Sequence, residues 1–151
     1  MNTKQITIIV LALISVTFWS CTTTNKKAKA EKSLYHRLGG YDAVAAVLDD
    51  FMGKMGNDPQ LKRFFTGMSP EGGRRTRQLI VDFVCEAAGG PCYYTGRTMK
   101  VTHDGMGFTD ADWNLAAGYL AATLDNFKVP AKEKNEVLTM VSDLKGDMVE
   151  N

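Results

Sequence analysis

Residues 91–105 read PCYYTGRTMKVTHDG, and this stretch contains His103, one of two histidines in the chain. Gly89 and Gly90 stand directly before it. Met99 and His103 are four residues apart, so in a short helix they share one face. A histidine in such a position is, by itself, more often a packed or surface side chain than a metal ligand. The interpretation of His103 therefore depends on the segments around it.

Apolar residues recur at intervals of three and four in four other segments, and this period indicates amphipathic helices. No segment alternates with period two for long enough to suggest a strand. The sequence therefore predicts an all-α domain. The predicted apolar stripes are Val44, Val47, Leu48, Phe51, Met52 and Met55; Thr76, Leu79, Ile80, Phe83, Val84 and Ala87; Trp113, Ala117, Leu120, Leu124 and Phe127; and Val137, Met140, Val141, Leu144 and Met148.

Capping residues, glycines and prolines predict where the helices begin and end. Ser33 can cap a short first helix, and Thr109 can cap a later one. Pro70, Gly72 and Gly73 predict a loop over residues 67–75. Further boundaries are predicted at Gly39–Gly40, Asp58–Pro59 and Gly89–Gly90, with a link over residues 91–98 and a last helix that opens at Pro130.

Several spaced motifs occur in the order in which a known family has them. They are LYHRLGG at residues 34–40, DF at 50–51, DPQL at 58–61, FF at 64–65, GGP at 89–91, YTG at 94–96 and MK at 99–100. With these motifs, which span most of residues 33–151, the chain resembles the group I truncated haemoglobins. The resemblance implies a two-over-two helical sandwich around haem b (iron protoporphyrin IX). It also implies reversible binding of a diatomic gas, oxygen or nitric oxide, at a histidine-ligated iron.

The same resemblance implies which residues contact the haem. His103 would be the metal ligand, and Thr76 would be the obvious hydrogen-bond donor on the opposite, distal side. Many family members have a tyrosine where this chain has Met52, so we expect bound oxygen to lose about 1.5–3 kcal/mol of stabilisation and to leave faster. The implied contacts are Phe51, Met52, Phe64, Phe65, Thr76, Leu79, Ile80, Phe83, Met99, His103 and Trp113.

Two other functions stay open at this point. Methionine opposite histidine is a ligand pair of electron-transfer haem proteins, so Met52 as a sixth ligand would indicate an electron carrier or a weak peroxidase. Met52 also fits a regular apolar stripe, which favours plain packing. A ligand-free interaction protein on a globin scaffold is the third possibility, since a fold does not prove a function.

The amino terminus predicts export. Lys4 is the only charged side chain in residues 1–20, and residues 6–18 are mostly apolar, as in a signal peptide. Cys21 follows Ser20 as in a bacterial lipoprotein cleavage site, which predicts a lipid anchor on the periplasmic or cell-surface side of a membrane. Residues 21–32 have no large apolar side chain and are interpreted as a tether. An uncleaved signal anchor or ordinary secretion is the alternative.

Charge and cysteine content restrict the partners. The formal net charge is +1 with no basic stripe, so no nucleic acid partner is expected. Cys85 and Cys92 form an even pair that either bridges or stays as two thiols. Neither belongs to a Cys-x-x-Cys-His string, so haem attachment should be noncovalent. A reductase partner is expected, and the sequence does not identify it.

Overall fold

The computed structural model describes residues 31–150, so the predicted signal, Cys21 and most of the predicted tether lie outside the described residues. Within residues 31–150 every regular element is a helix, which confirms the all-α prediction. No helix among the residues described is both long and apolar enough to cross a membrane. The elements are α2 (Leu34–Arg37), α3 (Tyr41–Asn57), the 3-10 helix η1 (Leu61–Phe65), α4 (Pro70–Ala87), α5 (Met99–His103), α6 (Asp110–Asn126), α7 (Ala131–Ser142) and α8 (Lys145–Met148).

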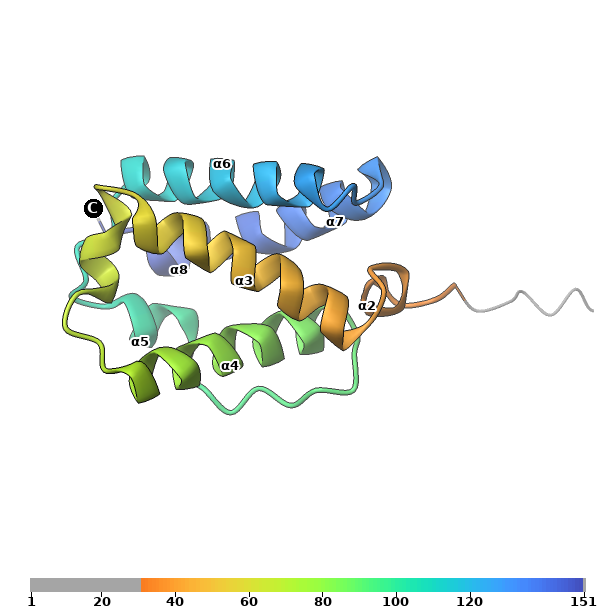
Figure 1. Cartoon of the computed structure of the whole chain (residues 1–151), viewed down its shortest axis with the longest axis horizontal. Coiled ribbons are helices and arrows are strands. Elements are labelled where there is room, and N and C mark those ends of the chain that lie inside the picture. Colours follow the sequence, from red (N-terminus) through yellow and green to blue (C-terminus); the bar gives the residue numbers. More distant parts are fainter. Residues whose placement is uncertain (1–30, 151) are drawn as a thin grey trace, which may run out of the picture. The chain divides into compact units, whose positions relative to one another are not determined.

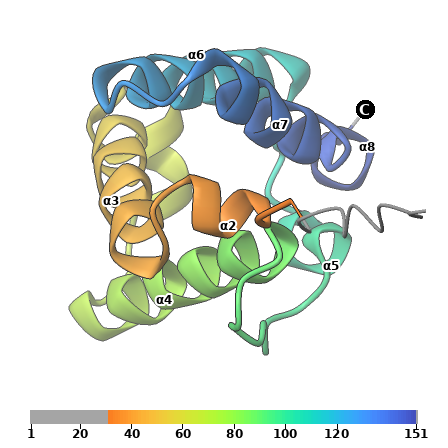
Figure 2. The ribbon, with the colours of Figure 1, turned by 90° about the vertical axis from the view of Figure 1, so that its right-hand side faces the viewer.

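Two pairs of long helices form the fold. α3 packs on α4, α6 packs on α7, and α3 also contacts α6 (Figure 1). In Figure 2, α6 and α7 lie together at the top, α4 lies at the bottom, and α3 lies along the left side. The short α5 contacts α8. This arrangement agrees with the predicted two-over-two sandwich.

Three clusters of buried apolar side chains hold these helices together. One joins α3 to α4, one joins α6 to α7, and one joins η1 to the start of α6. Each cluster combines residues from at least two elements, so each long helix is stabilised mainly by packing against its neighbours. Their central residues are Val44, Leu48 and Val81; Leu120, Leu124 and Val137; and Leu61, Phe108 and Trp113.

The loop predicted over residues 67–75 is shorter than expected, and the prediction is wrong for residues 70–75, which are helical. α4 begins at Pro70, directly after its N-cap Ser69, whose Oγ accepts a hydrogen bond from the N–H of Gly72 at 3.1 Å. Proline suits this position because its missing N–H would have no partner there. Each of Gly72 and Gly73 makes the helix about 1 kcal/mol less stable than alanine would. The Ser69 cap and the packing of α4 outweigh this cost.

The single last helix predicted from Pro130 is divided in the structure, so that prediction is also wrong in part. α7 ends at Ser142, and α8 starts at Lys145. The Ser142 hydroxyl donates a hydrogen bond to the carbonyl of Thr139 at 2.7 Å, a back-bond that bends helices. Two stripe residues at helix ends, Ala87 and Phe127, are exposed rather than buried.

A buried carboxylate starts α6. Asp112 has no exposed side-chain surface, and it accepts hydrogen bonds from the N–H of Thr109 at 2.9 Å, from Gln60 at 2.7 Å and from Arg63 at 2.7 Å. Burial alone would raise the pKa of this carboxyl, but the hydrogen bonds outweigh burial and lower the pKa of Asp112 to about 2. The predicted cap at Thr109 is confirmed, and η1 and α6 are fixed to each other.

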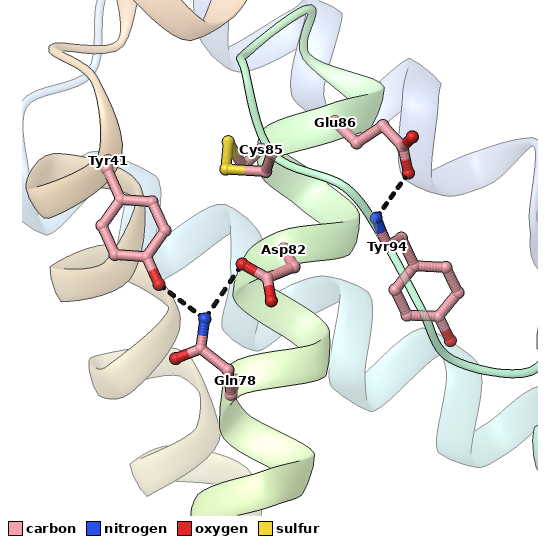
Figure 3. Close-up of a disulfide and its surroundings, with 7 residues drawn as sticks. Tyr41, Gln78, Asp82, Cys85, Glu86 and Tyr94 are labelled. Atoms are coloured by element: carbon pink, nitrogen blue, oxygen red, sulfur yellow. Dashed lines mark hydrogen bonds between the residues drawn. A yellow bond between two sulfur atoms is a disulfide. The ribbon is translucent and has the colours of Figure 1, made fainter.

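A disulfide joins α4 to the link that follows it. Cys85 and Cys92 are bridged, with 5.8 Å between their Cα atoms (Figure 3). Between them, a Cβ at Gly90 would lie 2.6 Å from Cδ2 of Tyr35 and 2.7 Å from Sγ of Cys85, so no larger residue fits. Of the two states that the sequence left open, the structure has the bridge.

We expect the bridge to stabilise the domain by restricting the unfolded chain. For a loop with a sequence separation of 7, chain-entropy arguments give about 2–3 kcal/mol, which corresponds to about 10 °C in Tm. A thiol reductant should therefore lower the Tm of the wild-type protein and leave that of Cys92→Ser, which has no bridge, unchanged. Two alkylatable thiols in freshly isolated native protein, found by mass spectrometry, would contradict the bridge.

Candidate functional site

One cavity, of about 770 Å³, lies between the helix pairs. Its volume is in the range of pockets that enclose whole cofactors, and its lining is mostly apolar. The structure brings all of the haem contacts that the sequence implied to this one cavity. Those residues are Phe51, Met52, Phe64, Phe65, Thr76, Leu79, Ile80, Phe83, Met99, His103 and Trp113.

α4 has two apolar faces, and they differ in burial. Val81 and Cys85 are fully buried, with Val81 packed in the cluster that joins α4 to α3. Leu79, Ile80 and Phe83 are only half-buried, and they line the cavity. This second face therefore leaves apolar surface that a ligand in the cavity could cover.

His103 ends the short helix α5, whose cap is Thr98. The Oγ1 of Thr98 accepts a hydrogen bond from the N–H of Val101 at 3.3 Å. Nδ1 of His103 lies 2.8 Å from the carbonyl oxygen of Met99. A carbonyl can only accept, so in the neutral imidazole Nδ1 carries the proton and Nε2 has the lone pair. Because His103 lines the cavity, that lone pair is available to a metal held there.

Phe108 is a site residue that the sequence interpretation missed. Its ring centroid lies 5.9 Å from that of His103 and 5.1 Å from that of Phe64, and it is almost fully buried. It stands directly before the Thr109 cap and shares a cluster with Trp113. An apolar residue before the cap commonly packs on the fourth helical residue, and this staple pattern was the available signal. The rings of Phe108 and His103 are packed edge to face, with an angle of 61° between their planes.

Methionines and two arginines complete the lining. Six of the eight methionines in the chain line the cavity, among them Met52 on α3 and Met68 and Met106, whose side chains are also partly exposed. Arg75 and Arg97 line it as well. Neither arginine was singled out from the sequence, because an exposed arginine has no periodic pattern that marks it.

Comparison with known proteins now identifies the domain. Residues 33–150 match the model of the family described as bacterial-like globin. The chain is 38% identical over 117 residues to a group 1 truncated haemoglobin of Mycolicibacterium paratuberculosis, covering 77% of this chain and 84% of that protein. The chain belongs to the group 1 truncated haemoglobins. These haem-binding globins bind diatomic gases such as oxygen.

Solved structures of truncated haemoglobins share the fold. The ferric truncated haemoglobin of Tetrahymena pyriformis matches with a TM-score of 0.71 at 28% identity, over 80% of this chain and 100% of that chain. A 2/2 haemoglobin from a Synechococcus species, solved in the cyanomet state with covalently attached haem, matches with a TM-score of 0.72 at 30% identity and the same coverage. The two-over-two sandwich is thus the shared architecture of this chain and its relatives.

The residues of this truncated haemoglobin fit a haem. Residues 31–150 contain no cluster of three or more His, Cys, Asp or Glu side chains that could hold a bare metal ion. A haem iron takes most of its ligands from the porphyrin, so the protein needs to supply only one ligand, and a single imidazole is sufficient. The apolar walls suit the flat porphyrin, and His103 supplies a nitrogen with a free lone pair.

We expect His103 to be necessary for haem retention. In His103→Gly the ligand is lost while room for a small base is created, so haem content should fall strongly and free imidazole should restore it. Absorption spectra and the haem-to-protein ratio give the readout. The matched control is His36→Gly, because His36 is exposed and does not line the cavity. A His103 variant that keeps wild-type spectra and haem content would disprove the assignment.

Proposed function

We propose that this protein holds haem b in the cavity through His103 and reversibly binds a diatomic gas, oxygen in the first place, on the opposite side. The hydrogen bond from Nδ1 of His103 to the Met99 carbonyl supports this most, because it leaves Nε2 as the coordinating atom in an apolar cavity. Bound haem would supply an iron with an open position for the gas. The chain itself holds the imidazole, supplies the mostly apolar lining and contributes the distal side chains.

The distal side chains determine how a polar ligand is stabilised. Met52 on α3 and Ile80 on α4 line the cavity, and neither can donate a hydrogen bond. Thr76, also on α4, is the one of these three distal residues that has a hydroxyl group. Oxygen becomes polarised on binding and gains from a donor, whereas carbon monoxide carries little charge. We therefore expect a pocket that holds oxygen less tightly than relatives with a tyrosine at the position of Met52.

Substitution of Met52 tests this account of the pocket. Met52→Tyr would add a hydroxyl, and we expect oxygen dissociation to slow about tenfold, which corresponds to one modest hydrogen bond of about 1.4 kcal/mol. Carbon monoxide dissociation should change much less. Stopped-flow dissociation rates for both gases give the answer. Met52→Leu, similar in size but without a donor, is the control, and an unchanged or faster oxygen off-rate in the tyrosine variant would refute the proposal.

A haem redox protein is the second candidate. Met52 and His103 line the same cavity from different elements, α3 and α5, so the thioether of Met52 is available as a sixth ligand. The ferrous spectrum separates the two functions. An open iron site supports gas binding, whereas a six-coordinate low-spin spectrum that Met52→Leu abolishes supports electron transfer or peroxidase activity.

We also propose that the domain acts outside the cytosol, held to a membrane by lipid on Cys21. The signal-like residues 1–20 and the cysteine that follows them support this proposal. The bridge between Cys85 and Cys92 supports export as well, since disulfides persist in oxidising compartments and are rare in the cytosol.

Metabolic labelling tests the anchor. Labelled fatty acid should be incorporated into the wild-type protein, and Cys21→Ala should accumulate as an unlabelled precursor that keeps residues 1–20. Cys92→Ser is the matched control, because it removes a different cysteine and should be labelled normally. Mature protein without lipid would reject the anchor, and a protein recovered only from the cytosol would reject export as well.

A further inference from the structure

The link between α4 and α5, residues 91–98, forms part of the cavity wall without forming a regular element. Residues 94–97 all line the cavity. Within the described chain, no backbone-to-backbone hydrogen bond joins residues 91–97 to another segment. Figure 1 shows this link running from the end of α4 back beneath that helix before it reaches α5. A wall without such bonds opens more readily than a helix, so its side-chain contacts decide how firmly it is closed.

In the described chain, three contacts join the link to α4, and all of them fall on one turn of that helix. The first is the bridge between Cys85 and Cys92. The second is a hydrogen bond of 3.0 Å from the N–H of Tyr94 to the carboxylate of Glu86 (Figure 3). The third is the edge-to-face contact between the rings of Tyr94 and Phe83, whose centroids are 5.2 Å apart. The bridge is the covalent one of the three.

The rest of the link is folded on Tyr94. Its hydroxyl donates a hydrogen bond of 2.6 Å to the carbonyl of Arg97, and a Cβ at Gly96 would overlap that hydroxyl, so only glycine fits there. Residues 94–97 therefore move together with the Tyr94 ring. If the ring leaves Phe83, this part of the wall leaves with it, and the cavity gains an opening beside α5.

Without the bridge, the link would depend on two weak contacts. Glu86 is exposed, and a hydrogen bond to an exposed carboxylate competes with water. One aromatic contact contributes little beyond the area that it buries. The bridge keeps Cys92 next to Cys85 when either of these contacts breaks, so the broken contact stays within reach of its partner and forms again.

The bridge is accessible from the side of the link. Cys85 has no exposed surface, whereas Cys92 is half-buried and stands between the exposed residues Pro91 and Tyr93. Thiol–disulfide exchange begins when a thiolate attacks an accessible sulfur atom. A reductant in solution therefore attacks Sγ of Cys92.

We propose that the bridge between Cys85 and Cys92 is a redox switch that controls access to the cavity through the link. With the bridge intact the link stays closed and haem is retained, and after reduction the link opens and haem exchanges with the surroundings. The inference rests on the proposed binding of haem b, but the opening of the link is a property of the chain itself. In an oxidising compartment the link would be closed.

The reductant is a dithiol, and the reaction balances over two exchanges. Its thiolate attacks Sγ of Cys92 and forms a mixed disulfide, while Sγ of Cys85 leaves and takes up a proton. The second thiol of the reductant then attacks the reductant's sulfur in the mixed disulfide and releases Cys92 as a thiol. Two electrons and two protons pass from the dithiol to the protein, and the dithiol becomes a disulfide.

Trypsin cleavage after Arg97 measures the opening of the link on the protein as purified. Arg97 is the only lysine or arginine in residues 89–98, and cleavage reports the population of the open form. We expect Cys92→Ser to be cut there about tenfold faster than the bridged protein. Wild type that is reduced with dithiothreitol and freed of it under argon should behave in the same way. Cleavage after Lys128, in the exposed turn between α6 and α7, is the internal control and should not change.

Haem loss from the ferric holoprotein to excess apomyoglobin measures the consequence for the cavity. Cys92→Ser should lose haem about tenfold faster than bridged wild type, because haem leaves through the open form. Reduced wild type should lose haem as fast as this variant. Reoxidation of the wild-type thiols should restore the slow rate, whereas the same treatment should not change Cys92→Ser.

A matched control separates the link from the stability of the whole domain. Val81→Ala removes buried side-chain volume from the same helix, keeps the bridge and does not alter the cavity lining. It should lower the Tm. The ratio of cleavage after Arg97 to cleavage after Lys128 should stay at the wild-type value, and haem loss should stay close to the wild-type rate.

The outcomes separate this inference from the function on which it rests. If Cys92→Ser and wild type are cut after Arg97 at equal rates, or if cleavage after Arg97 and Lys128 rises equally, the bridge does not control the link and the inference fails. If cleavage after Arg97 rises while haem loss does not, haem does not pass through the link, and control of access is refuted. If wild type binds no haem, the proposed function fails together with haem exchange, whereas cleavage after Arg97 still shows whether the bridge closes the link.

Discussion

The central constraint on this fold is a cavity of about 770 Å³ that is lined by apolar side chains from both helix pairs. Phe51, Leu79 and Ile80 face it and remain half-buried. Apolar surface of this kind contributes about 25 cal/mol for each Å² removed from water. In this domain part of the apolar surface would be buried only when a ligand occupies the cavity. The free energy of unfolding and ligand binding are therefore thermodynamically linked.

An open cavity requires walls that are fixed from outside, and the short elements serve this purpose. The disulfide holds the start of the link to α4, and Thr98 caps the helix at its other end. After His103, the carboxylate of Glu150 accepts hydrogen bonds from the N–H groups of Met106 and Gly107 at 2.9 and 3.2 Å. The segments on both sides of the imidazole are thus restrained by contacts that do not enter the cavity.

Much of this could be predicted from the sequence, because helical period and capping residues act locally. The stripes of α3 and α4 and the position of His103 depend on such local signals. The start of α4 at Pro70 was missed although Ser69 and Pro70 are themselves a local signal for a helix start, because Gly72 and Gly73 suggested a loop. Phe108 was missed for a different reason. The staple pattern before Thr109 marks it as a packed residue, but its contact with His103 depends on which elements meet in space, and a single sequence does not show that.

The methionine-rich wall has a chemical consequence. Thioether side chains are flexible and polarisable, so the wall can adapt its shape more readily than one made of branched residues such as Ile80. The same sulfur atoms are open to oxidation, and a sulfoxide at Met52 would place a polar, chiral group in an apolar wall. Met68 and Met106, which are also partly exposed, would meet an oxidant from solvent first. The methionines that make the pocket adaptable therefore also make it sensitive to peroxide. Methionine sulfoxide reductases would be the enzymes that convert the oxidised side chains back to methionine.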